Sequence, residues 1–532
     1  MSGADAQQWQ TAVEEHLQTH EQLGSFVEVI VPVQKKVLPS KWVYQLKTDA
    51  HGRVVRHKAR YVVLGFLQRR GVDYNEVFSP TIRGDQIRLL VGHGAKQTGV
   101  RMRLHGRKVT VLGKGDVYSA YTTADMPEGE EVLFELPEGY RPKLVAPGGH
   151  KVVARSIKAQ QGTKQAGRVW NRYQHKCLTE QGFVQCEAAP CIYMKELADG
   201  YLLAGIFVDD VLFVNASDNK EAVQNAVKAL SKYYEIKYSD TLEKFLGAEF
   251  EELDEGIYMH LNQYVTEMMS RFEIGEKTAP TPEASESDEL SAADQALLLH
   301  ADKKKYQEIT GAVMFCMTTC RPDIAHAVNT LSRKMSAPRL CDLRTARRVL
   351  QYLNGTRRLG LLFKFETSAV HSGLLAYVDA DWANDKVERR SVSGYVVLYN
   401  GTPVSWYSGL QSVVALSTCE AEYVALTEGC REVGYLKQLM GFLREPADCP
   451  VEIREDNQGT IDLSNNPVHH KRTKHIDVKY HYVRRAQENG TVNVVKLHTD
   501  HNRADIMTKA TTAPTFRRHV DALMHSPARA AA

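Results

Sequence analysis

The sequence of 532 residues has no long apolar run. No uninterrupted apolar stretch reaches about 18 residues, the length that a membrane-spanning helix needs. The opening residues, MSGADAQQWQ, lack a basic stretch followed by an apolar one, so the sequence predicts no secretory signal. These absences argue against a membrane protein. The composition, with 43% hydrophobic and 25% charged residues, is typical of soluble globular proteins.

Cysteine is scarce, and neither sign of charge dominates. The nine cysteines are scattered and odd in number, which predicts reduced thiols rather than a disulfide framework. Cys316 and Cys320 lie close together without a second pair at metal spacing, so a zinc site is not expected. The net charge is only +3, so a surface that binds nucleic acid has to come from local basic clusters.

Two strand-rich regions lie on either side of a helical one, and the chain is too long for a single core. Strand-like and helical runs alternate up to an exposed linker rich in Pro, Ser, Ala and acids, Lys277–Ala296. A helical stretch, Lys305–Leu353, follows, and a second strand-rich unit begins near Leu374. The tail after Thr511 is expected to be disordered. The sequence therefore predicts two mixed α/β units with a helical connector.

Two adjacent acids, Asp209 and Asp210, interrupt the apolar run LLAGIFVDDVLFV. The flanking residues are expected to pair as a buried hairpin that holds the acids at the rim of a sheet, where Mg²⁺ can reach them. The alternative is that the acids only cap the turn. Asp116, in GDVYSAY, offers the further carboxylate that a two-metal site for phosphoryl transfer needs. On its own, Asp116 is an ordinary strand-end or turn residue.

Two further stretches carry groups that suit a nucleotide. Lys58 and Arg60 are two residues apart, so on a strand they share a face and can clamp a triphosphate. The alternative is a solvated basic strand edge. In QQGTKQAGRVW, Gly162 lets the backbone approach a nucleotide closely, while Gln161 and Lys164 supply hydrogen-bond donors.

These stretches, in this order, resemble the reverse transcriptase of copia-type LTR retrotransposons. The similarity spans about residues 42–250. The matching stretches are KWVYQLKTDAHG, RHKARYVVLGFLQRRGVDYNEVFSP, GDVYSAY, LFELPEGY, QQGTKQAGRVW, GFVQCEAAPCIY, GIFVDD and EKFLGAEF. The resemblance implies a right-hand polymerase with fingers, palm and thumb.

The resemblance also implies roles for single residues. Tyr121, shortly after Asp116, falls at the aromatic steric-gate position, where a ring collides with a ribose 2′-OH and favours dNTPs over rNTPs. The other implied roles are two catalytic Mg²⁺ ions on Asp116, Asp209 and Asp210, the incoming dNTP on Gln161, and its phosphates on Lys58 and Arg60.

The second unit carries four acids at predicted strand ends and helix starts, and any one of them alone is a cap or a surface acid. Ser417 or Thr418 is expected to cap a helix, and Asn400–Gly401 to form a two-residue hairpin turn. The acids are Asp379 at the end of the strand LLAYVDADWA, Glu422 in the first turns of STCEAEYVAL, Asp456 at the end of VEIRED, and Asp505 in a last helix, HNRADIMTKA.

The order of three strands, helix, strand, helices, strand and helix resembles the RNase H fold, in its copia-type version, over about residues 374–510. This resemblance implies that the four acids hold two Mg²⁺ ions and activate water to cut the RNA strand of an RNA–DNA hybrid. The basic segment HHKRTKH, His469–His475, is expected to lie along phosphates, so affinity should fall with salt. The alternative is an ordinary solvated basic loop.

Together the resemblances imply an RNA-directed and DNA-directed DNA polymerase with RNase H activity. The implied partners are an RNA template, a DNA primer, the RNA–DNA hybrid and dNTPs, with Mg²⁺ or alternatively Mn²⁺ as cofactor. The implied location is cytoplasmic, in a virus-like particle, with the nucleus as an alternative, and the oligomeric state is left open. The alternative function is an inactive or domesticated retroelement relic that binds nucleic acid without catalysis.

The expected domains follow from the same resemblances. They are an N-terminal extension (1–40), fingers and palm (41–250), thumb and connection (251–370), an RNase H-like domain (371–510) and a disordered tail (511–532). The segment RLHGRKVTVLGKG before Asp116 is longer and more basic than in the family, which predicts a loop insertion or a weakened strand. The chain shows no protease, integrase or zinc-knuckle segment, so a processed product, a polyprotein fragment and a truncated copy all stay open.

Overall fold

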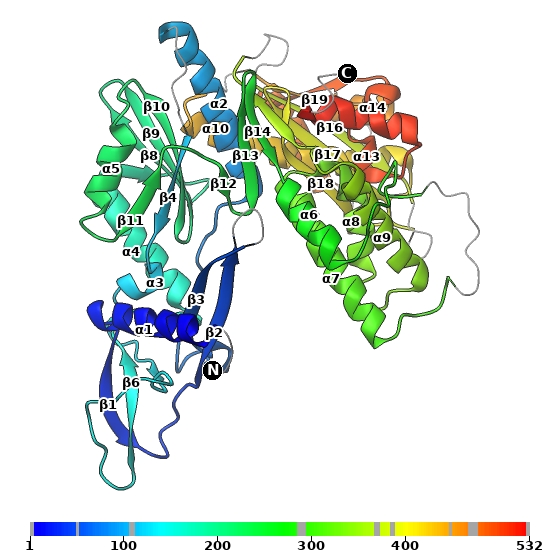
Figure 1. Ribbon diagram of the computed structural model, residues 1–532. Helices are drawn as coiled ribbons and strands as arrows, with labels where there is room; N and C mark the ends of the chain where they lie inside the picture. Colours follow the sequence, from blue (N-terminus) through cyan, green and yellow to red (C-terminus); the bar gives the residue numbers. More distant parts are fainter. Residues whose placement is uncertain are drawn as a thin grey trace. The chain divides into compact units, whose positions relative to one another are not determined.

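The computed structural model describes residues 5–48, 53–105, 112–284, 294–366, 373–383, 389–445, 449–465 and 477–527 (Figure 1). The chain forms two compact units. Unit 1 comprises Met1–Ile82, Gly113–Gln185 and Pro190–Asp240, and unit 2 comprises Arg83–Leu112, Cys186–Ala189 and Thr241–Ala532. The expected mixed α/β fold class is confirmed, with sheets and helices in both units. Among the described residues, no helix combines the length and apolarity that crossing a bilayer requires.

Unit 1 is built around a six-stranded sheet of order β11-β4-β10-β9-β8-β7, beside a sheet β1-β6-β5 and the hairpin β2-β3. The strands of the larger sheet are β4 (Leu112–Val117), β7 (Phe183–Gln185), β8 (Ile192–Leu197), β9 (Gly200–Phe207), β10 (Asp210–Ser217) and β11 (Ile236–Ser239). The other strands are β1 (Phe26–Pro32), β2 (Ser40–Thr48), β3 (Val54–Val63), β5 (Leu133–Phe134) and β6 (His150–Ser156). The helices are α1 (Ala6–Gln22), α3 (Ala120–Thr123), α4 (Ala166–Glu180) and α5 (Ala222–Leu230).

The core of unit 1 lies between the six-stranded sheet and its helices. Apolar residues of β9 and β10 are buried on both faces, which explains the nearly unbroken apolar run in the sequence. Trp170 of α4 and Leu230 of α5 join them in one cluster. Strand β9 pairs antiparallel with β10, so the hairpin predicted around the two adjacent acids is confirmed.

Unit 2 contains a four-stranded sheet, a group of helices and a five-stranded sheet. The first sheet is β12 (Lys244–Phe245), β13 (Ala248–Leu253), β14 (Gly256–His260) and β15 (Leu361–Lys364). The helices before the second sheet are α2 (Gly84–His105), α6 (Asn262–Arg271), α7 (His300–Thr319), α8 (Ala325–Arg333) and α9 (Leu340–Gly355). The predicted helical stretch, residues 305–353, consists of α7, α8 and α9 with short connections.

The five-stranded sheet has the order β18-β17-β16-β19-β20. Strands β16, β17 and β18 pair antiparallel, while β19 runs parallel to β16 and to β20. Asn400 and Gly401, both with positive φ, form the predicted hairpin turn. The elements are β16 (Leu374–Asp381), β17 (Val392–Tyr399), β18 (Thr402–Leu410), α10 (Thr418–Phe442), β19 (Val451–Glu455), α11 (Gln458–Asn465), α12 (Asp477–Glu488), β20 (Val492–Lys496), α13 (Asp505–Thr508) and α14 (Ala513–Leu523).

Helix α2 belongs to unit 2, although it stands between strands of unit 1 in the sequence. Arg88 is buried and donates to the Val404 carbonyl at 2.7 Å and to two carbonyls at the end of α7 at 2.8 Å. Gly99 lies so close to Phe365 that a Cβ would stand 1.9 Å from its carbonyl oxygen. The predicted fingers and palm, residues 41–250, are therefore interrupted by a helix that packs in the other unit.

The prediction of a disordered tail is wrong for residues 513–523, which form α14. Phe516, Val520 and Leu523 are buried, and the ring of Phe516 packs against that of Tyr352 with centroids 5.6 Å apart. These apolar residues have helical spacing, which the polar composition of the tail concealed. Asp505 lies in the separate four-residue helix α13 rather than in a long last helix.

Two further expectations concern the N-terminal segment and stretches that lie outside the described residues. The N-terminal segment 1–40 is not a separate extension, because β1 pairs along its length with β6 and α1 packs on β3. The basic segment 469–475 lies outside the described residues, as do residues 285–293 of the predicted linker. The remaining domain boundaries stay a prediction.

Candidate active sites

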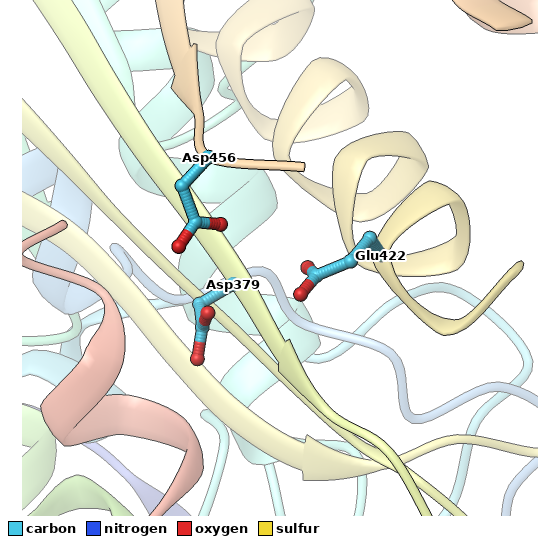
Figure 2. A group of neighbouring side chains, drawn as sticks. All are labelled: Asp379, Glu422 and Asp456. Carbon is cyan, nitrogen blue, oxygen red and sulfur yellow. The ribbon is translucent and has the colours of Figure 1, made fainter. Parts of the chain in front are cut away.

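Three carboxylates of unit 2 come together beside the five-stranded sheet (Figure 2). Asp379 lies on β16, Asp456 directly follows the parallel strand β19, and Glu422 lies on α10, which packs on β16. Their carboxylate oxygens lie within 4.8 Å of one another. Among the described residues, no other group of three or more His, Cys, Asp or Glu side chains is gathered this closely.

Local structure explains why Glu422 faces the strands. Ser417 caps α10, since its side chain accepts a hydrogen bond from the Glu420 backbone N–H at 3.2 Å, which confirms one of the two predicted caps. Further along the helix, Gly429 lies against Val378, and a Cβ there would stand 2.5 Å from a Val378 methyl carbon. The glycine therefore lets α10 approach β16 closely enough to bring Glu422 to the acids.

Two acids of the cluster are buried, the third is partly buried, and one buried oxygen lacks a hydrogen-bond partner. Asp379 is 2% exposed and Glu422 8% exposed. Burial raises the pKa of Asp379 to about 7, with Lys509 opposing the rise and Asp505 adding to it. Burial, followed by the charge of Asp379, raises the pKa of Glu422 well above its ordinary value. Glu422 Oε2 has no hydrogen-bond partner. A buried carboxylate oxygen in this state is costly unless a cation compensates it, so these residues fit a hard divalent ion.

Asp505 lies at the edge of this cluster, next to a lysine. Lys509 Nζ lies 3.3 Å from Asp505 Oδ1 and 3.7 Å from Asp379 Oδ2, and the Thr508 hydroxyl donates to Asp379. Burial disfavours the ammonium form, but the two carboxylates outweigh this and raise the pKa of Lys509. The structure thus brings the fourth predicted acid near the others, outside the group of three.

A fifth acid of this region was missed by the sequence reasoning. Glu455 is fully buried beside Asp456, its Oε1 accepts a hydrogen bond from the Asn457 N–H at 2.9 Å, and its Oε2 has no partner. Burial raises its pKa well above the ordinary value. Because Glu455 ends an alternating strand with an inward-facing residue, the period of VEIRED was the signal that could have found it.

The acids of unit 1 have a different environment. Asp116 lies on β4, next to β10 in the sheet, and Asp209 and Asp210 lie where the β9–β10 hairpin turns. The backbone N–H of Val117 donates to the Asp209 carbonyl at 2.8 Å, which ties β4 to this turn. Asp116 and Asp209 are exposed. Partial desolvation, then the charges of Asp210 and Asp116, raises the pKa of Asp209. The three acids are therefore neighbours, but less tightly gathered than those of unit 2.

The turn that carries the two adjacent acids is held in an unusual conformation. Val208 has a φ of 56°, which is strained for a β-branched residue. Its carbonyl accepts a hydrogen bond of 2.7 Å from the indole of the buried Trp170. Strained backbone that surrounding contacts hold in place is common at functional sites.

Two basic residues approach these acids, one of them not anticipated. The charge of Lys58 on β3 partly opposes the rise in the pKa of Asp209, and burial together with the charge of Arg60 lowers the pKa of Lys58 itself. Lys114 Nζ forms an ion pair of 2.9 Å with Asp210 Oδ1. Lys114 is two residues before Asp116 on the same strand, so shared-face spacing was the signal that could have found it.

Two other residues that are predicted to contact the nucleotide, Arg60 and Tyr121, lie in different surroundings. Arg60 lies on the same face of β3 as Lys58 and donates to Gln45 Oε1 at 3.3 Å. Tyr121 lies in α3, partly buried, and burial and then the charge of Asp209 raise its pKa. Asp209 therefore lies near both Lys58 and Tyr121.

The loop before α4 is built on β3. The backbone carbonyl of Gln161 accepts from the Val63 N–H at 2.9 Å. Gly162 has a φ of 91°, and a Cβ there would stand 2.2 Å from the Val63 carbonyl oxygen, so this glycine serves close packing of loop on strand. Lys164 is exposed and its Nζ lies 5.0 Å from the centre of the Tyr74 ring. The predicted approach of this backbone to a nucleotide stays a prediction.

Comparison with known proteins agrees with this architecture. The family model described as Reverse transcriptase (RNA-dependent DNA polymerase) matches residues 25–284. The Retrovirus-related Pol polyprotein from transposon TNT 1-94 of Nicotiana tabacum is 32% identical over 97% of this chain and 38% of its own length. A putative transposon Ty5-1 protein of Saccharomyces cerevisiae is 32% identical over 51% of this chain and 87% of its own length.

The chain belongs to the copia-type retrotransposon Pol polyproteins and contains their reverse transcriptase region. It spans less than two fifths of the tobacco polyprotein that it matches. Among solved structures, a foamy viral protease–reverse transcriptase in complex with double-stranded DNA aligns with 92% of this chain and 70% of its own, at 12% identity and a TM-score of 0.46.

Proposed function

We propose that this chain is an RNA-directed and DNA-directed DNA polymerase that also cleaves the RNA strand of an RNA–DNA hybrid. The observation that carries the nuclease half is the group of three carboxylates, with one oxygen of each within 4.8 Å of the others, in which the buried Oε2 of Glu422 has no hydrogen-bond partner. Such an arrangement is costly in a metal-free fold and is suited to a divalent cation. The polymerase half is supported by family membership together with three acids on neighbouring strands.

In the nuclease site, Asp379, Glu422 and Asp456 would hold a divalent ion, with Asp505 on the other side of Asp379. Bound Mg²⁺ supplies a water of lowered pKa and stabilises the charge that develops on the phosphate. The protein residues do the positioning. The Thr508 hydroxyl fixes one oxygen of Asp379, and the cap at Ser417 together with Gly429 fixes the approach of Glu422.

In the polymerase site, Asp116, Asp209 and Asp210 would hold the metal ions that accompany a dNTP. Lys58 and Arg60 share one face of β3 and are suited to the phosphates of that nucleotide. Tyr121 lies near Asp209 and is suited to contact the sugar, where its ring would exclude a 2′-OH. Lys114 neutralises Asp210 and limits the repulsion between adjacent carboxylates.

The proposed substrates are an RNA or DNA template with a DNA primer, and the RNA–DNA hybrid that polymerisation produces. Purified full-length chain is incubated with an RNA template annealed to a DNA primer, dNTPs and Mg²⁺, and both strands are followed. Primer extension and template cutting are expected, and EDTA should stop both. Retained binding of the duplex without either reaction would instead support the inactive relic.

A further inference from the structure

Lys509 stands at one edge of the nuclease acids. Its Nζ lies 3.7 Å from Asp379 Oδ2 and 3.3 Å from Asp505 Oδ1. Asp379 is also a member of the group of three acids with Glu422 and Asp456. The Asp379 carboxylate therefore contacts a lysine ammonium and also belongs to a group with Glu422 and Asp456, for which the described residues show no ion pair.

The lysine is held in this place by its local structure. Asp505 and Lys509 are four residues apart across the short helix α13, which puts both side chains on one face. The Thr508 hydroxyl donates to the same Asp379 oxygen that Lys509 approaches. The Lys509 side chain is 37% exposed, so the ammonium reaches the acids from the solvent side. The Lys509 side chain can therefore move away from the acids without disruption of the buried core.

The group of Asp379 with Glu422 and Asp456 and the pair of Asp379 with Asp505 therefore differ in how readily they can bind a metal ion. A site with two divalent ions needs the ions about 4 Å apart. An ion among Asp379, Glu422 and Asp456 meets two carboxylates, those of Glu422 and Asp456, for which the described residues show no ion pair, and it shares Asp379 with Lys509. A second ion between Asp379 and Asp505 meets carboxylates that already bind an ammonium.

We propose that Lys509 is a built-in cation that occupies the Asp379–Asp505 side of the nuclease site and is displaced when the second divalent ion binds. This inference rests on the proposed nuclease function, since it assumes that the acids bind metal. Lys509 stabilises the metal-free fold by compensating two buried acids, and it weakens the apparent affinity for the second ion by competition. It acts as a positioning residue and a competitor rather than as a ligand.

The test compares Mg²⁺ binding by full-length wild type and Lys509→Met, which removes the charge and keeps an unbranched apolar side chain. Isothermal titration calorimetry and the thermal unfolding midpoint are both followed against Mg²⁺ concentration, without nucleic acid. In EDTA, Lys509→Met should unfold at a lower temperature than wild type. Its half-saturating Mg²⁺ concentration should be lower by about fivefold, because a unit charge has been removed from the site.

Two controls separate competition from a general loss of an ion pair. Lys509→Arg keeps the charge and should bind Mg²⁺ like wild type. Lys96→Met removes a matched lysine from a buried carboxylate elsewhere in unit 2, because Lys96 is 30% exposed and its partner Glu445 4% exposed, against 37% and 4% for Lys509 and Asp379. Lys96→Met should lower the unfolding temperature without changing the Mg²⁺ dependence.

The Mg²⁺-binding results that would overturn this inference differ from those that would overturn the proposed function. If wild type binds Mg²⁺ and Lys509→Met binds it with equal or lower affinity, Lys509 does not compete and the inference is overturned. If wild type and Glu422→Gln are alike in showing no Mg²⁺ binding, the proposed metal site itself fails and the inference falls with it.

Discussion

The two proposed acid sites of this chain are built in contrasting ways. In the proposed nuclease site, Asp379 and Glu422 are buried, one carboxylate oxygen each of Asp379, Glu422 and Asp456 lies within 4.8 Å of the others, and Glu422 Oε2 has no hydrogen-bond partner. The polymerase acids lie on a hairpin turn and a neighbouring strand, where Asp116 and Asp209 are exposed and Asp210 is paired with Lys114. The buried acids of the proposed nuclease site are therefore costly without a compensating cation. The acids of the proposed polymerase site are more accessible to solvent and to a nucleotide.

The largest effect should come from removing the unpaired acid of the buried site. Glu422→Gln is expected to lower hybrid cleavage by about 10³-fold, equivalent to about 4 kcal/mol of transition-state stabilisation, because a metal ligand is lost. The same change should stabilise metal-free unit 2 by about 1–2 kcal/mol, because a buried unpaired charge is removed. Hydrogen exchange of the β16 amides in EDTA measures the second effect.

Glu432→Gln is the matched control for this change. Glu432 lies on the same helix α10 and is largely buried, but it accepts a hydrogen bond of 2.7 Å from the Ser405 hydroxyl. Its replacement should leave hybrid cleavage near the wild-type rate. Equal losses of cleavage for both variants would mean that the helix, rather than the acid cluster, had been disturbed.

The buried site should also make metal-free stability depend on pH. The folded-state pKa of Asp379 is raised to about 7, above its ordinary value, so its contribution is fully present at low pH and is lost as the pH rises toward 7. The free energy of unfolding in EDTA is expected to fall by on the order of 3 kcal/mol between about pH 4 and pH 7. Denaturant titrations at several pH values measure this.

Mg²⁺ should oppose that fall, because the ion favours the charged carboxylates. A metal-free protein whose stability in EDTA is constant or rises between these pH values would contradict the assignment of a buried, desolvated acid cluster.

In unit 1, the loop before α4 packs tightly on β3. Substitution of two glycines, Gly162 and Gly139, tests this packing. Gly162→Ala is expected to destabilise unit 1 by about 3 kcal/mol, from positive φ and a clash with the Val63 carbonyl together. Gly139 has a similar φ of 88° but nothing within 4 Å of the Cβ position, so Gly139→Ala should cost only about 1 kcal/mol. Equal costs would show that the loop does not press on β3.

A smaller effect is expected at the proposed sugar contact. Tyr121→Val should increase rNTP incorporation relative to dNTP incorporation by about tenfold, or about 1.4 kcal/mol, because the ring no longer excludes a 2′-OH. Single-nucleotide extension assays give the ratio. Tyr118→Val, at an exposed tyrosine that contacts Thr19 at 3.1 Å, is the control and should leave the ratio unchanged. An unchanged ratio for Tyr121→Val would remove that residue from the role.

Much of the fold could be predicted from the sequence because local signals agreed with it. The apolar runs flanking Asp209 and Asp210 gave the hairpin, the Asn400–Gly401 pair gave the turn, and Ser417 capped α10 as expected. The acids of the nuclease site could be proposed because each stood at the end of a strand or in the first turns of a helix. Their order matched one sheet topology.

What could not be predicted depends on contacts between distant segments. Helix α2 packs in unit 2 through Arg88 and Gly99, and neither residue has a local signal that names a partner more than 200 residues away. The cations Lys114 and Lys509 are ordinary lysines in the sequence, and only the fold brings them to Asp210 and Asp379. The tail was missed because polar residues obscured a helical spacing of apolar ones.

The central claim is that the two acid sites perform separate reactions. The most direct measurement follows both strands of one substrate, an RNA template on a labelled DNA primer, with Asp116→Asn and Asp379→Asn in the full-length chain. We expect Asp116→Asn to stop primer extension and still cut the RNA of a preformed hybrid, and Asp379→Asn to do the reverse. Loss of both reactions in either folded variant, or of neither, would contradict the account.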